Sequence, residues 1–99
     1  MSEVTKELTP AEMANFLISR VIGEEIEAER VLKKASVEAN ANAAAARQFD
    51  ANKPYFAANP YGRNQAFLLL QVQIAAQKFH ECQQIRNFVV ENFAQHINN

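Results

Sequence analysis

Aromatic and cationic side chains gather in the segment of residues 53–63. Lys53, Tyr55, Tyr61 and Arg63 all lie within it. An aromatic ring can stack on a nucleotide base while a nearby cation holds the phosphate, and the same residue types are common in protein-binding hot spots. Three interpretations stay open. The segment can be a loop that packs back on the helices, a contact site for a protein, or a site for a nucleotide or another anion built from Lys53, Tyr55, Tyr61 and Arg63.

Other residues that could carry chemistry lack the spacing that chemistry requires. A carboxylate-bridged metal site on facing helices needs Glu-x-x-His, but Gln77 stands three residues before His80. His80 and Cys82 are two positions apart, so on a helix they point to different sides and cannot form a catalytic dyad. The acidic residues within 24–29 fit a solvated helix face. We therefore expect no enzyme, no catalytic residue, no metal and no cofactor.

Two long stretches of helix-forming residues flank the aromatic segment. They predict an all-α antiparallel hairpin as a single domain of residues 1–99, with one helix at 9–49 and a second at 64–97. Residues 50–63 form the connecting loop, and residues 1–8 form an N-terminal tail. Asn and Pro at residues 59–60 suit a turn inside the loop and equally suit the start of the second helix.

The start of the first helix carries the clearest boundary signal in the chain. Thr9 can serve as the N-cap, Pro10 suits the first helical position, and Glu12 completes a capping box. Gly23 costs about 1 kcal/mol relative to Ala inside a helix, so the first helix can bend there.

Apolar residues recur every three or four positions on both helices, which predicts that each helix buries one face and that the two pack as a coiled coil. On the first helix Glu25 is the charged interruption of this face. A reversal near residue 57 would place Arg86 beside Ala28 and Glu29, because both arms rise at the same rate. The predicted faces are Ala14, Leu17, Ile18, Val21, Ile22, Glu25, Ala28, Val31, Leu32 and Ala35 on the first helix, and Leu68, Val72, Ala75, Phe79, Cys82, Ile85, Val89, Phe93 and Ile97 on the second.

The second helix has more apolar side chains than one buried face can hold. A hairpin buries a single stripe per helix, so the remaining apolar side chains need another covering surface. We expect this surface to come from other copies of the chain. The predicted interface residues are Phe67, Leu70, Ile74, Phe88 and Val90.

Composition narrows the class of protein. The 99 residues are 48% hydrophobic with a net charge of −1, which excludes a disordered chain and gives no general attraction to nucleic acid or to anionic lipid. No run approaches the roughly 18 apolar residues needed to span a bilayer. The lone Cys82 cannot form an intrachain disulfide, which fits a reducing compartment. We expect a cytoplasmic protein.

This plan of two helices is similar to that of several small secretion-system subunits, phage assembly proteins and phage counter-defence proteins. The expected function is a non-enzymatic helical protein that homo-oligomerises through its second helix and acts as a structural subunit or as an inhibitor or adaptor of another protein. Membranes and nucleic acid are not expected partners. The alternative is a ligand-binding module that captures a nucleotide or another anion with the connecting loop, at a junction between subunits.

Overall fold

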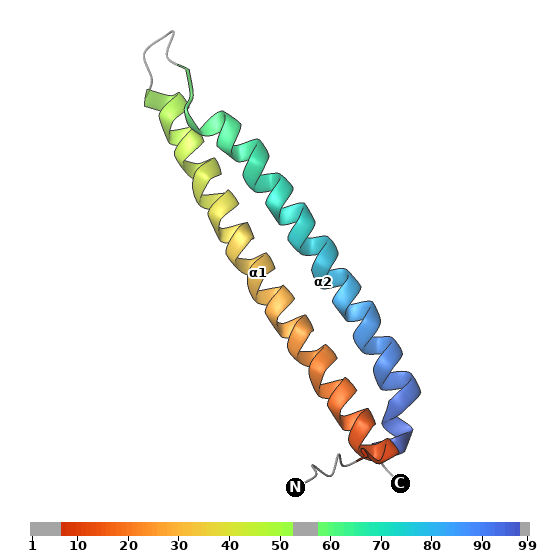
Figure 1. Ribbon diagram of the computed structural model, residues 1–99. Coiled ribbons are helices and arrows are strands. Elements are labelled where there is room, and N and C mark those ends of the chain that lie inside the picture. Colours follow the sequence, from red (N-terminus) through yellow and green to blue (C-terminus); the bar gives the residue numbers. More distant parts are fainter. Residues whose placement is uncertain (1–6, 53–57, 98–99) are drawn as a thin grey trace, which may run out of the picture.

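The chain folds into two long helices that lie side by side. The computed structural model describes residues 7–52 and 58–97, and within these ranges it contains α1, Pro10–Asn52, and α2, Tyr61–Ile97, and no strand. Figure 1 shows that the start of α1 and the end of α2 lie at the same end of the molecule. The predicted antiparallel helical hairpin is confirmed. The helices are longer than expected, because α1 continues past residue 49 and α2 begins before residue 64.

A capping box fixes the first residue of α1, as the sequence predicts. The backbone N–H of Thr9 donates to Oε1 of Glu12 at 2.9 Å, and the N–H of Glu12 donates to Oγ1 of Thr9 at 3.1 Å. These two bonds satisfy backbone donors that a helix start leaves without partners. From there α1 runs through Gly23 without interruption to Asn52.

Asn59 sets the start of α2 and ties it to α1. Its Oδ1 accepts a hydrogen bond from the N–H of Tyr61 at 2.9 Å, and its Nδ2 donates to the carbonyl oxygen of Ala46 at 3.0 Å. Both roles left open for residues 59–60 are seen in part: the N–H of Gly62 donates to the carbonyl oxygen of Asn59 at 3.3 Å, which closes a turn, and this turn leads directly into α2 at Tyr61. The residue before Tyr61 is Pro60, whose fixed φ favours helix initiation.

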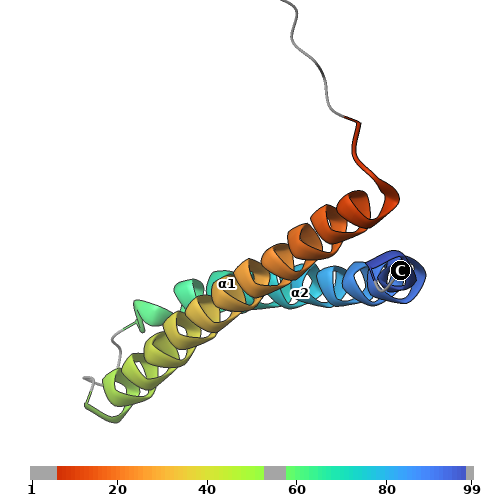
Figure 2. The ribbon, with the colours of Figure 1, turned by 90° about the horizontal axis from the view of Figure 1, so that it is seen from below.

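The core between the helices is built from small side chains. Buried residues follow one another at intervals of seven along each helix: Ala14, Val21 and Ala28 on α1, and Ala75, Cys82 and Val89 on α2, with Ala39 as a further buried residue of α1. Residues at heptad intervals lie on one side of a helix and so stay against the other helix. We call these buried rows the seam. Small residues on this seam allow the two helix backbones to approach closely, and Figure 2 shows α1 and α2 crossing each other.

One member of the predicted face of α2 lies elsewhere. Ile85 is 50% exposed, and the neighbouring Arg86 is directed toward α1, where its Nε donates to Oε1 of Glu25. Between the buried residues Cys82 and Val89, the residue that faces α1 is Arg86. A charged residue therefore occupies the position on the buried face that the sequence analysis assigned to Ile85. The pairing also corrects the expected register, which placed Arg86 beside Ala28 and Glu29.

Candidate interaction surface

Large apolar side chains of both helices lie on the outside of the hairpin. Phe67 is 58% exposed, Leu70 50%, Ile74 55% and Phe88 62%, while Val90 is half-buried. Val90 follows Phe88 by two positions and therefore lies on a different side of α2. Other exposed apolar side chains are Leu8, Met13, Phe16, Ile22, Ile26, Val31, Val37, Leu69 and Ile85.

A second regular row runs along α2 beside the buried seam. Its members follow one another in alternating steps of four and three residues, which keeps them on one side of a helix. We call this row the α2 stripe, and it consists of Phe67, Gln71, Ile74, Lys78, Glu81, Ile85 and Phe88. The stripe is apolar toward both ends and charged at its centre. Sequence reasoning found three of its members, Phe67, Ile74 and Phe88, but assigned Ile85 to the core and overlooked the repeat through Lys78 and Glu81.

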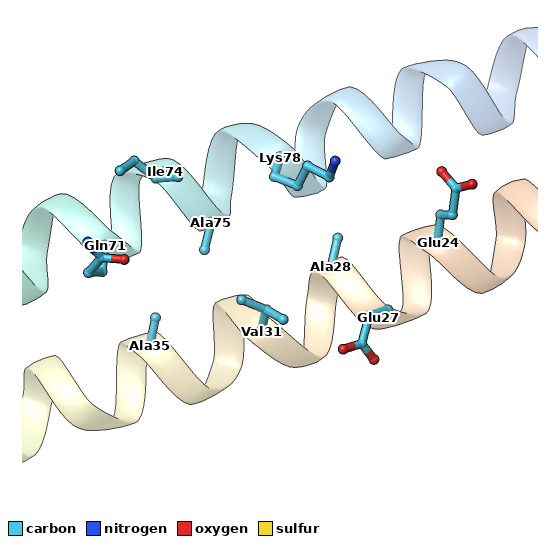
Figure 3. A pocket seen from close by; sticks show the side chains of 9 residues that line it. All are labelled: Glu24, Glu27, Ala28, Val31, Ala35, Gln71, Ile74, Ala75 and Lys78. Carbon is cyan, nitrogen blue, oxygen red and sulfur yellow. The ribbon is translucent and has the colours of Figure 1, made fainter.

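An open groove of about 480 Å³ runs between the helices next to the middle of the α2 stripe. Figure 3 shows Ala28 and Ala35 pointing from α1 toward α2, and Ala75 pointing back. The short side chains of the seam leave this space unfilled. The groove is lined by Glu24, Glu27, Ala28, Val31, Ala35, Gln71, Ile74, Ala75 and Lys78.

The charged residues that line the groove differ in whether they have an ion-pair partner. On α1, Nε of Arg20 lies 3.2 Å from Oε1 of Glu24, and Nη2 of Arg30 lies 2.5 Å from Oε1 of Glu27. The hydrogen bond from Arg30 lowers the pKa of the Glu27 carboxyl below its ordinary value. On α2, by contrast, Lys78 forms no ion pair within the described ranges.

The acidic member of the α2 stripe, Glu81, makes a weak local contact. Nε2 of Gln77 donates to Oε1 of Glu81 at 3.4 Å, the long end of the hydrogen-bond range. Both charged residues at the centre of the stripe are exposed. Their charges are therefore available to a surface that covers α2.

The predicted ligand site at the loop is only partly within the described residues. Tyr61 is half-buried, and its ring lies 6.3 Å from that of Phe49 in an edge-on arrangement, so this tyrosine packs against α1. Arg63 is exposed. Lys53 and Tyr55 lie outside the residues that the structure describes, so a site formed by these four residues stays a prediction.

Polar contacts strengthen the end of the hairpin where Tyr61 lies. Nδ2 of Asn42 donates to the carbonyl oxygen of Tyr61 at 3.1 Å and to Oε1 of Gln65 at 2.7 Å. All of these atoms are partly buried, and the amide of Asn42 bridges the two helices. The alanine-rich part of α1 thus meets α2 through polar contacts as well as through the small side chain of Ala39.

Residues that could carry catalysis are dispersed over the hairpin. Cys82 is buried in the seam, whereas His80, two residues earlier, is exposed. In the described part of the chain, no three His, Cys, Asp or Glu side chains are grouped so that they could hold a metal ion. Neither α1 nor α2 offers an apolar segment suited to crossing a lipid bilayer.

Comparisons of this chain with protein-family models, with curated proteins and with solved structures found no match.

Proposed function

We propose that this protein is a non-enzymatic helical hairpin that assembles with copies of itself through α2, and that it acts as a structural subunit or as an inhibitor or adaptor of a partner protein. The observation that carries the proposal is an inverted distribution of side-chain size. The buried residues in the described ranges are alanine, valine and cysteine, while ten phenylalanine, leucine and isoleucine side chains are between 39% and 65% exposed.

Exposure of this kind costs free energy that association can recover. Burying a large aliphatic or aromatic side chain contributes roughly 1.5–3 kcal/mol. Four of the proposed interface residues, Phe67, Leu70, Ile74 and Phe88, are each at least half exposed in the single chain. Covering them with a second copy therefore supplies a driving force of several kcal/mol before the costs of association are subtracted.

The accessible area points in the same direction. The chain exposes 7759 Å², whereas a compact monomer of this mass exposes about 5,700 Å². A single layer of two helices thus exposes more surface than a compact fold of the same mass.

The direct test is the molar mass in solution of the unmodified chain and of the double variant Leu70→Asp/Ile74→Asp. We expect the unmodified chain to elute as an oligomer at micromolar concentration by light scattering. The variant is expected to dissociate or unfold, because a carboxylate buried without a partner costs several kcal/mol. Circular dichroism distinguishes a helical monomer from an unfolded chain.

Val37→Asp is the matched control. Val37 is an apolar residue of α1 with 67% exposure, and it lies outside the α2 stripe. The same chemical change at this position should leave the molar mass unchanged if assembly proceeds through α2. A monomeric unmodified chain would refute the proposal, and equal dissociation by both variants would refute the assignment to α2.

A further inference from the structure

We infer that a second copy of this chain packs antiparallel along the α2 stripe, with a two-fold axis between Lys78 and Glu81, so that Lys78 of each copy pairs with Glu81 of the other. This inference rests on the proposed self-association and adds the surface, the orientation and the register. Three observations on the described residues support it: the order of side chains along the stripe, the charges at its centre, and the groove beside it.

Six of the seven residues of the stripe fall opposite one another when the stripe is reversed about its charged centre. An antiparallel alignment that places Lys78 opposite Glu81 also places Ile74 opposite Ile85 and Gln71 opposite Phe88. Ile74 and Ile85 are 55% and 50% exposed. In this alignment Ile74 of each copy contacts Ile85 of the other, so the contact occurs once on each side of the axis. A two-fold interface requires this self-complementarity, because each contact occurs twice with the roles exchanged.

The charges at the centre select the antiparallel orientation. In a parallel alignment in register, each Lys78 would lie beside another Lys78 and each Glu81 beside another Glu81, and like charges brought together at an interface are unfavourable. The antiparallel alignment gives two pairs of opposite charge instead. Lys78 has no ion-pair partner among the described residues, and Glu81 has only the 3.4 Å contact from Gln77, so neither must give up a strong bond.

The groove provides room for side chains of the second copy. Gln71, Ile74 and Lys78 belong to the stripe and also line the groove, together with Ala28 and Ala75 of the buried rows. Figure 3 shows the Ile74 and Lys78 side chains on the α2 side of this space. In the proposed register the Ile85 side chain of the second copy lies opposite Ile74, which lines the groove, so it is the side chain expected to cover this space.

The test exchanges the charges between two separately purified full-length variants, Lys78→Glu and Glu81→Lys. Each variant alone places two pairs of like charge at the axis, so its dissociation constant should rise by about tenfold or more. A one-to-one mixture restores both pairs, because Glu at 78 of one chain meets Lys at 81 of the other. We expect the mixture to form a heteromeric complex of unmodified affinity, measured by sedimentation and confirmed by native mass spectrometry.

Rescue by mixing separates this arrangement from an effect within one chain. Residues 78 and 81 are also neighbours on the same helix, and a change in that local interaction would not be repaired by a second chain. The control variant is Lys33→Glu on α1, where Lys33 pairs locally with Glu29 at 3.0 Å and lies outside the stripe. It should leave the dissociation constant unchanged.

The outcomes distinguish this inference from the proposed function. If the unmodified chain is a monomer, both are wrong. If it is an oligomer that neither charge variant weakens, or if each variant weakens it and the mixture does not recover, then self-association stands and the antiparallel register is overturned. Circular dichroism of each variant verifies that the helices are retained.

Discussion

The pair formed by Glu25 and Arg86 is the main charged contact between the helices in the described ranges. Their side chains are only 18% and 33% exposed, in contrast to the pair of Arg20 and Glu24 on α1, which is 67% and 52% exposed. A partly buried pair is screened less by water, and loss of one partner leaves the other desolvated without compensation. Glu25 thus interrupts the apolar face of α1 because α2 supplies a cation to meet it.

This contrast predicts unequal effects on stability. Glu25→Leu or Arg86→Leu alone should lower the free energy of unfolding by about 1–3 kcal/mol, since each leaves a partly buried charge without its partner. Replacing both residues with leucine should cost less than the sum of the single changes. Urea denaturation at one fixed protein concentration measures all three variants.

The exposed pair is the control for this prediction. Glu24→Ala should change stability by less than about 1 kcal/mol, because exposed ion pairs contribute little. Strictly additive effects of Glu25→Leu and Arg86→Leu would show that the two residues do not interact in solution.

At the scale of the helix, α1 contains one position that is not optimised for helix stability. Gly23 lies in the interior of Pro10–Asn52, it is exposed, and a β-carbon added there would have no neighbour within 4 Å. Its backbone does not adopt a positive φ. Neither packing nor conformation therefore requires glycine here in the single hairpin.

Gly23→Ala should accordingly raise the free energy of unfolding by about 1 kcal/mol, because alanine loses less backbone entropy than glycine on entering a helix. The reverse change, Ala44→Gly, at another exposed position of α1, should lower it by a similar amount. Both variants are measured by urea denaturation. A destabilising effect of Gly23→Ala would indicate that this position contacts a partner surface that needs the space.

The molecule as a whole is one layer of helices. Its dimensions are 74 × 36 × 14 Å and its radius of gyration is 22.2 Å, compared with about 13 Å for a compact domain of 100 residues. Stable domains are normally built from at least two packed layers around a common core. Packing of a second hairpin along the α2 stripe, as proposed above, would enlarge the core of each chain.

If assembly supplies part of the core, stability depends on protein concentration. The midpoint of thermal unfolding should rise as concentration increases, because association favours the folded state by mass action. Circular dichroism melts over a hundredfold range of concentration provide the measurement. A midpoint that does not change over this range would show that the single hairpin is stable without association and would contradict self-association.

Features set by local chemistry could be predicted from the sequence. The capping box of Thr9 and Glu12 involves neighbours along the chain, so its residue types alone indicate where α1 begins. The recurrence of apolar residues every three or four positions likewise identifies Ala75, Cys82 and Val89 as a buried row. The helical class and the hairpin follow from these signals together with the turn residues between the arms.

The tertiary structure alone decided the register of the two helices and the side of α2 that stays exposed. Arg86 meets Glu25 instead of the residues expected opposite it, and Ile85 lies outside the seam, because interhelical packing and charge pairing fix the offset. Periodicity gives the spacing of a buried row but not which of two adjacent residues belongs to it. That choice exposes the α2 stripe, since a seam of small residues buries one narrow face of each helix.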